Sequence, residues 1–175
     1  FNMITPYLRK DCIISDIASV KTGLREYYKE AGFPFASSHP MFGPTFADLR
    51  NLRTQSAIVI SESSAEGKDF FLDLYNSLNL QVFEYTFEKH DETIAYSLSI
   101  PLASTLVFNA VMKHPEATGT TFKRHMDIAK GLLSEDDYLL TEILFNPYTT
   151  DQIKGIRAKL AELLDIVERK DGEAM

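Results

Sequence analysis

The sequence has a single cysteine, fewer basic than acidic residues and no secretory signal at its start. Cys12 has no partner for an intrachain disulfide, which is in keeping with a reducing, cytoplasmic environment. Lysine and arginine total 18 against 25 aspartates and glutamates, so the formal net charge is -7. This acidic balance argues against a nucleic-acid partner. No apolar run approaches the length of a membrane span, so we expect no membrane partner either.

Motifs for two kinds of bound group are missing as well. The 8 glycines form no G-x-G-x-x-G loop, the feature that holds the pyrophosphate of a dinucleotide. The 4 histidines form no H-E-x-x-H pair or other tight ligand pair, so we expect no metal site. Dinucleotide chemistry would therefore need a cofactor loop from outside these residues.

The first half of the chain alternates short apolar runs with helical stripes. We expect strands at 12–17, 35–37, 57–60 and 80–85, and helices at 21–31 and 65–78. Gly32 follows the first helix as its C-cap. This rhythm is typical of a doubly wound α/β sheet. The strand at 12–17 is continuously apolar and expects neighbours on both sides, so we expect the chain to be a fragment or to lack an N-terminal part.

The second half has helical patterns alone. Pro101 lies in the middle of the long apolar stretch 88–113 and predicts a kink or a break. A helix at 120–133 follows, and then one capped by Ser134, with acids in its first turn, that ends before Pro147. The last helix starts near Thr150 and has one apolar face. That face carries Ile153, Ile156, Leu160, Leu163, Leu164 and Val167. A long apolar helix in a small helical domain has more apolar surface than one protomer buries, so we expect homodimerisation through this all-helical domain.

The most constrained segment is H-P-M-F-G-P at 39–44. Pro40 biases His39 toward extended backbone angles, and Gly43 and Pro44 punctuate the chain a few residues later. We therefore expect a histidine on a restrained loop just past a short strand, where ligands bind in open α/β sheets. The alternative is a histidine that caps a turn without a catalytic role.

Ser19 also follows a strand, so it can face the same sheet edge as His39. A serine there can orient the imidazole or bind a substrate hydroxyl, and it can equally serve as the N-cap of the helix that comes next. We interpret Lys21 as a solvated helix residue rather than as a phosphate contact.

Four segments together resemble the prephenate/arogenate dehydrogenase family. They are D-I-A-S-V-K at 16–21, H-P-M-F-G-P at 39–44, H-D at 90–91 and T-F-K-R at 121–124 followed by A-K-G-L at 129–132. The resemblance runs from about residue 6 to residue 147. It implies that 1–86 form the C-terminal part of a Rossmann-like dinucleotide-binding domain and that 87–175 form a helical substrate-binding and dimerisation domain. The glycine-rich loop would lie in an N-terminal part of roughly 60 residues or more, with at least two βα units.

The resemblance also implies roles for individual residues. His39 matches the histidine that hydrogen-bonds the ring 4-hydroxyl of prephenate and helps to remove its proton, and Ser19 matches the serine that orients this hydroxyl. Arg124 matches an arginine that grips a substrate carboxylate, although an ion pair on a charged helix surface is a rival interpretation. His90 matches a histidine near the substrate pocket. Ser19 and Pro40 are expected beside the cofactor, which would be NAD or NADP.

The implied activity is the oxidative decarboxylation of prephenate to 4-hydroxyphenylpyruvate in tyrosine biosynthesis, in the cytoplasm. Ser99 and Leu102 stand where some relatives have histidine, which leaves arogenate open as the substrate. Another β-hydroxyacid dehydrogenase is a more distant alternative. If no cofactor segment accompanies these residues, a non-catalytic dimerisation module is the remaining hypothesis.

Overall fold

The computed structural model describes residues 3–43, 50–113, 116–134 and 136–175. The chain divides into two compact units, Phe1–Glu92 and Thr93–Met175. This division falls inside helix α3 (Phe87–Ile94), a little after the change of pattern at residue 86. The α3 helix therefore begins with the sheet and ends in the helical unit.

The first unit is built on a four-stranded sheet in the order β1-β2-β3-β4. The β1–β2 and β3–β4 pairs are parallel, whereas β2 and β3 are antiparallel. The described part of the β2–β3 connection contains a 3-10 turn rather than a crossover helix, and only a crossover would make that pair parallel. The elements are η1 (Thr5–Tyr7), β1 (Ile14–Asp16), α1 (Leu24–Ala31), β2 (Phe35–Pro40), η2 (Leu52–Thr54), β3 (Ser56–Ile60), α2 (Ala65–Ser77) and β4 (Gln81–Tyr85).

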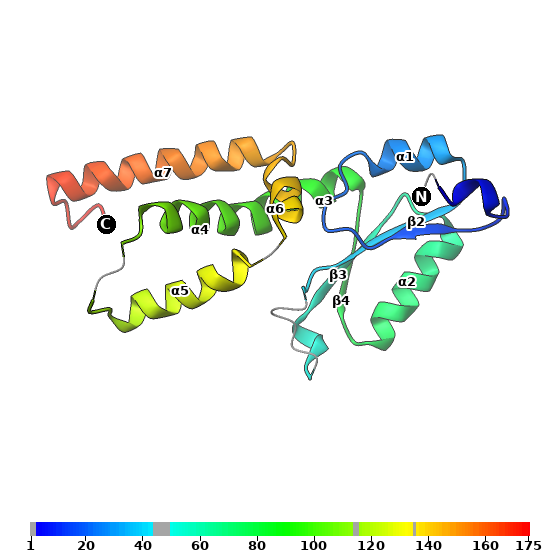
Figure 1. Ribbon diagram of the computed structural model, residues 1–175, viewed down its shortest axis with the longest axis horizontal. Helices are drawn as coiled ribbons and strands as arrows, with labels where there is room; N and C mark the ends of the chain where they lie inside the picture. The colour runs from blue at the N-terminus through cyan, green and yellow to red at the C-terminus, as the bar shows by residue number, and fades with distance from the viewer. Residues whose placement is uncertain (1–2, 44–49, 114–115, 135) are drawn as a thin grey trace. The chain divides into compact units, whose positions relative to one another are not determined.

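Helices α1 and α2 cover opposite faces of this sheet (Figure 1). Side chains alternate along β2, so that Phe35 stacks on Tyr28 of α1 while Ala36 packs on the other face with Phe71 of α2. One core contains Ile14, Tyr28, Phe33, Ile58, Ile60 and Phe87, and the other contains Ala36, Ala57, Val59, Phe71, Tyr75 and Leu80. The predicted α/β architecture is confirmed.

Strand β2 is longer than predicted and includes His39. His39 pairs with Ile58, and Pro40 pairs with Ala57. The prediction of a loop at His39 is therefore wrong. Pro40 favours extended angles at His39, and at the last position of a strand its missing N–H costs little, so the proline extends the strand. Gly43 comes after the end of the strand, and Pro44 lies outside the described residues.

The second unit is helical, as predicted. The break near Pro101 takes the form of a π-helical segment, η3, directly before α4, and Pro101 lies in the first turn of α4. Ser99, at the end of η3, is fully buried, and its hydroxyl donates to the Ile143 carbonyl at 3.0 Å. Thr149 donates to the Ser99 hydroxyl at 2.8 Å. The elements are η3 (Ala95–Ser99), α4 (Ile100–Val111), α5 (Thr120–Leu132), α6 (Asp137–Leu144) and α7 (Thr149–Arg169).

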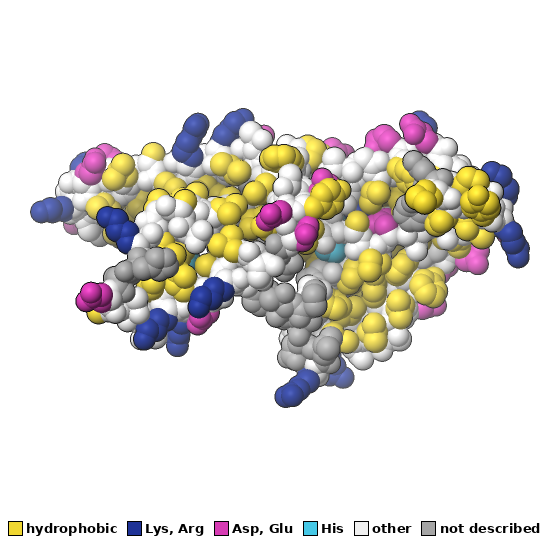
Figure 2. All heavy atoms as spheres, in the orientation of Figure 1, with side chains coloured by type: hydrophobic (Ala, Val, Ile, Leu, Met, Phe, Trp, Pro, Cys, Tyr) yellow, Lys and Arg dark blue, Asp and Glu magenta, His cyan; other side chains and the backbone are white. Residues whose placement is uncertain are grey.

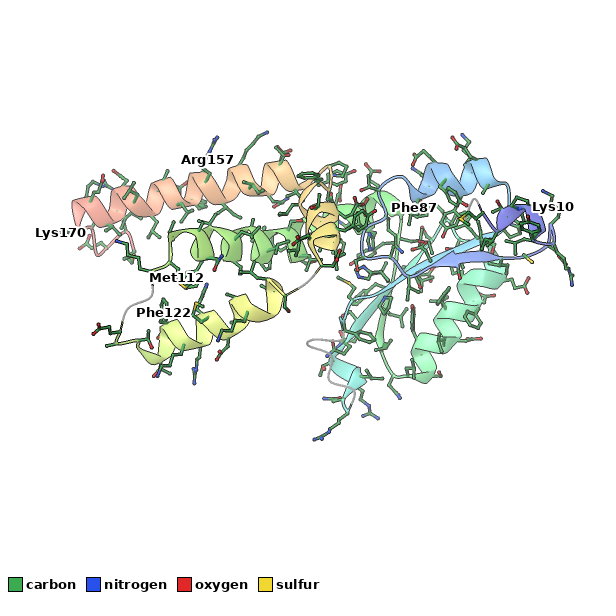
Figure 3. All side chains as sticks on the ribbon, viewed as in Figure 1. Lys10, Phe87, Met112, Phe122, Arg157 and Lys170 are labelled. Atoms are coloured by element: carbon green, nitrogen blue, oxygen red, sulfur yellow. The ribbon has the colours of Figure 1, made fainter. Side chains whose placement is uncertain are left out.

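Helix α4 packs against both α5 and α7 (Figure 1). Phe122 of α5, labelled in Figure 3, lies with its ring centroid 6.0 Å from that of Phe108 of α4. The cap of α6 differs from the prediction, because the Asp136 carboxylate accepts the Tyr138 N–H at 2.9 Å. Ser134 instead donates to the Gly131 carbonyl at the end of α5. Aspartate and serine are equally good N-caps, so local preference does not choose between the two positions.

The apolar face predicted for the last helix lies largely exposed along α7, and Figure 2 shows hydrophobic side chains gathered over α4 and α7. Leu160 is 52% exposed and Leu164 is 57% exposed. A stripe of this kind on a helix ordinarily marks a contact surface.

The prediction that no apolar run approaches the length of a membrane span is wrong. The helical run Phe87–Val111 has 25 residues and is long and apolar enough, by length and composition, to cross a membrane. Buried core helices of soluble proteins meet the same criterion. Within this chain, 28% of the apolar window of the run is buried. Near the start of the run, His90 and Asp91 are buried and hydrogen-bonded to polar groups of the sheet unit.

Candidate functional site

The carboxyl ends of β1 and β2 lie at the same sheet edge, because the two strands are parallel and Asp16 is in register with Ser37. Ser19 lies half-buried in the loop after β1, and His39 and Pro40 are the last two residues of β2. The predicted shared edge of Ser19 and His39 is therefore present. Ligands in open α/β sheets bind at such an edge.

His39 is 6% exposed and contacts a second histidine. Its Nδ1 lies 2.9 Å from Nε2 of His90, which α3 supplies, and the two ring centroids are 5.2 Å apart. His90 is fully buried. Both ring nitrogens of His90 have protein partners, His39 and Asp91. Its position near a substrate pocket stays a prediction.

Asp91 is the second partner of His90. One carboxylate oxygen, Oδ1, lies 2.9 Å from Nδ1 of His90 and accepts the main-chain N–H of Lys21 at 3.1 Å. The other oxygen accepts the Thr22 hydroxyl at 2.9 Å. A chain of hydrogen bonds therefore runs from the loop before α1 to Asp91, from Asp91 to His90, and from His90 to His39.

Lys21 is buried, contrary to its interpretation as a solvated helix residue, and it precedes α1. Its ammonium donates to Asp16 at 2.5 Å and to the Ser38 carbonyl at 2.6 Å. Asp16 also accepts the Tyr28 hydroxyl at 2.6 Å and the Ala18 N–H at 2.9 Å. The loop after β1 therefore places the Lys21–Asp16 ion pair against β2, the strand that carries His39. The hydrogen bonds of the pair offset the cost of removing its charges from water.

Strand β2 is held from its other face as well. The Ser38 hydroxyl lies 2.8 Å from the Tyr75 hydroxyl of α2, and both groups are buried. Contacts on Ser38 therefore fasten the residue before His39 through its side chain and through its carbonyl. Such support limits the freedom of the neighbouring imidazole.

The electrostatic setting keeps His39 neutral. Burial, together with the nearby His90 and Lys21, lowers the pKa of His39 to about 3, although Asp16 and Asp91 act in the opposite direction. Burial also lowers the pKa of His90, against the hydrogen bond to Asp91. Burial alone would raise the pKa of Asp16, but the Lys21 charge and the hydrogen bonds outweigh it, and the pKa is lowered. A neutral imidazole can accept a proton, and a pKa of about 3 makes this one a weaker base than an ordinary histidine.

The other predicted positions are less informative. Arg124 is exposed on α5 in the second unit. Leu102 is buried in α4. The described residues contain no group of three or more potential metal ligands. The structure adds Asp16, Lys21, Thr22 and Asp91 to the site. The sequence signal for them is limited to Asp16 and Lys21 sharing the D-I-A-S-V-K segment and to Asp91 directly following His90.

No protein-family model matches the chain. It is similar to a probable arogenate/prephenate dehydrogenase of Methanocaldococcus jannaschii, with 27% identity over 97% of this chain and 41% of that protein. It is also similar to the T-protein of Enterobacter agglomerans, with 21% identity over 97% of this chain and 47% of that protein. The chain thus spans less than half the length of these curated relatives.

Solved structures show the same fold. A prephenate dehydrogenase from Aquifex aeolicus, in complex with hydroxyphenyl propionate and NAD+, has a TM-score of 0.78 and 19% identity, over 98% of this chain and 65% of that one. An arogenate dehydrogenase from Synechocystis has a TM-score of 0.72 and 16% identity, over 98% and 67%. The fold is that of a Rossmann-like sheet followed by a helical part, as found in these oxidoreductases. The curated and structural neighbours of the chain are prephenate and arogenate dehydrogenases over nearly its whole length, which confirms the resemblance.

Proposed function

We propose that the full-length protein carrying this chain oxidatively decarboxylates prephenate to 4-hydroxyphenylpyruvate with NAD or NADP, in the tyrosine pathway and in the cytoplasm. The observation that carries the proposal is a buried, neutral His39 at the shared carboxyl edge of β1 and β2. The dehydrogenase neighbours over nearly the whole chain support it.

The residues of this chain have distinct tasks in that reaction. His39 accepts the proton of the ring 4-hydroxyl, and Ser19 orients this hydroxyl at the same edge. A bound nicotinamide would supply the acceptor for the hydride that leaves C4 of the ring. The ring carboxylate then leaves as carbon dioxide and the ring becomes aromatic, so the protein mainly positions and polarises the substrate. Arg124 is proposed to hold a substrate carboxylate, for which its fork of donors is suited.

The residues present fit one end of a dinucleotide. The edge after β1 and β2 suits the nicotinamide, and we assign Ser19 and Pro40 to that end. The chain has no glycine-rich loop for the pyrophosphate, so none of its residues is assigned to that group. Nothing in these contacts favours NAD over NADP.

Arogenate is the second candidate substrate, because the names of the neighbours include both dehydrogenases. At the two positions where some relatives have histidine, Ser99 is tied to the Ile143 carbonyl and Leu102 is buried. Comparing kcat/KM for prephenate and arogenate decides between them. If neither is turned over by the full-length protein, the non-catalytic module becomes the better hypothesis.

We further propose a homodimer through the exposed apolar face of α7. Replacing Leu160 by glutamate places a charge in the middle of this face and should shift the sedimentation coefficient to that of a monomer. The matched change Lys159→Glu, on the polar side, should leave the association unchanged. A protein that is monomeric before any substitution would contradict the proposal.

The decisive experiment on the reaction is His39→Asn in the full-length protein. The asparagine amide can still donate to His90 but offers no basic nitrogen, so kcat should fall by about 10²- to 10⁴-fold while the protein stays folded. His125→Asn, at an exposed position of α5, is the matched control. Turnover of the His39→Asn protein close to that of the unsubstituted one would refute the assignment.

A further inference from the structure

Asp91 accepts hydrogen bonds from the main chain and the side chain of the loop before α1. The main-chain N–H of Lys21 has no acceptor capacity, and it bonds to Oδ1 of Asp91. The Thr22 hydroxyl donates to Oδ2. Asp91 is buried, and a carboxylate surrounded by donors is held as an acceptor. Nδ1 of His90, which lies 2.9 Å from Oδ1, must then carry the proton that the two atoms share.

The tautomer of His90 is fixed by this bond. A neutral imidazole carries one proton, so a protonated Nδ1 leaves Nε2 of His90 as an acceptor. The same Nε2 lies 2.9 Å from Nδ1 of His39. A hydrogen bond at this distance requires a donor, which is Nδ1–H of His39.

We propose that Asp91 and His90 are positioning residues that fix neutral His39 as the Nδ1–H tautomer, so that its Nε2 is the atom that accepts a proton. Within the described part of the chain, Nε2 of His39 makes no hydrogen bond. The catalytic consequence rests on the proposed function, whereas the tautomer itself does not.

The relay also serves the protonated state of His39. When Nε2 takes up a proton, Nδ1–H stays a donor to His90, so neither ring has to turn. The carboxylates of Asp16 and Asp91 favour the imidazolium, while the ammonium of Lys21 opposes it. A preorganised acceptor of this kind avoids reorganisation during proton transfer.

The direct test is nitrogen NMR of the histidine rings in this chain, labelled at histidine. With 4 histidines, long-range proton–nitrogen correlations separate the rings, and single His→Gln variants assign them. At neutral pH we expect pyrrole-like Nδ1 and pyridine-like Nε2 shifts for both His39 and His90. A protonated Nε2 on either ring would overturn the proposal.

Two substitutions at Asp91 form a matched pair. In Asp91→Asn the amide oxygen should take the place of Oδ1, because the Lys21 N–H needs an acceptor, and the two tautomers should persist. In Asp91→Leu the acceptor is gone, and both rings should lose their fixed tautomers. Asp16→Asn removes a nearby, partly buried carboxylate that bonds to Lys21 and Tyr28 rather than to either ring, and it should leave the tautomers unchanged. If Asp91→Leu does not fold, the shifts of the unsubstituted chain and of Asp91→Asn still decide.

Activity separates this proposal from the proposed function. In the full-length protein, Asp91→Leu should lower kcat by on the order of a hundredfold with little change in KM, and Asp91→Asn by less than about tenfold. If Asp91→Leu releases the tautomers but kcat is unchanged, the proposal about the tautomers stands. The assignment of His39 as the proton acceptor is then refuted. Unchanged tautomers in Asp91→Leu would refute the relay, whatever the activity.

Discussion

Lys21→Met removes the ammonium that is buried beneath the strand of His39. This ammonium donates to Asp16 and to the Ser38 carbonyl, and its side chain is fully buried. Methionine has a similar length and keeps the main-chain N–H that bonds to Asp91. The substitution therefore isolates the ammonium from the rest of the residue.

The expected cost is large because Asp16 stays behind. Its side chain is 9% exposed, and it would keep only the Tyr28 hydroxyl and the Ala18 N–H. Removing one partner of a buried pair costs about 3–5 kcal/mol, which includes the charge left without compensation. The total free energy of unfolding of a domain is about 5–15 kcal/mol, so the sheet unit should unfold at a much lower urea concentration.

The assay is urea unfolding followed by tyrosine fluorescence and circular dichroism. Lys68→Met is the matched control, since its partly exposed pair with Glu84 at 3.1 Å should contribute less than about 1 kcal/mol. The double variant Lys21→Met/Asp16→Asn should be more stable than the sum of the single changes predicts, because no unpaired charge remains. Additive losses, or a loss in Lys21→Met no larger than in Lys68→Met, would refute this account.

Two further predictions concern packing and pH. Gly67→Ala should lower the free energy of unfolding by about 1–3 kcal/mol, because the added Cβ would lie 2.7 Å from Cβ of Ala36. The control Gly155→Ala, whose Cβ would meet no atom within 4 Å, should stabilise α7 by up to about 1 kcal/mol. Equal urea midpoints for the two variants would contradict this prediction. The pKa of His39 is about 3 in the folded state and 6.5 in the unfolded state, so between these pH values only the unfolded state binds a proton at this residue. The contribution of His39 to the free energy of unfolding is therefore fully present above pH 6.5 and falls as the pH is lowered toward 3. His39→Gln should flatten this slope by about one proton, and an unchanged slope would contradict the lowered pKa.

Local patterns were enough for most of the fold. The β-branched run at 57–60 is β3, the stripe at 65–78 is α2, and Pro101 marks the break before α4. These features depend on residues close in sequence, so periodicity and proline chemistry reveal them. The limits of β2 were missed because its last residues are strand only through their pairing with Ile58 and Ala57, which no local pattern shows.

The site was predictable only in part for the same reason. His39 and Ser19 were found from their motifs, but the partner of His39 is 51 residues away in sequence. Burial of Lys21 depends on Asp16 and on a main-chain carbonyl of a neighbouring strand. The local sequence does not reveal these partners, and a lysine just before a helix is ordinarily exposed to solvent.

Lys21 contributes both to the neutrality and to the placement of the His39 imidazole, although burial is the main cause of the lowered pKa. Its ammonium pairs with Asp16 and lowers the pKa of His39, while its main-chain N–H holds the carboxylate that orients His90. The charge and the orientation are therefore separable by substitution. Lys21→Met should let the pKa of His39 rise while both rings keep their Nδ1–H tautomers, whereas Asp91→Leu should release the tautomers and leave the Lys21–Asp16 pair in place. If Lys21→Met also releases the tautomers, the ammonium of Lys21, and not its N–H, fixes them. That result would contradict the proposal that Asp91 fixes the tautomer of His90 and, through it, that of His39.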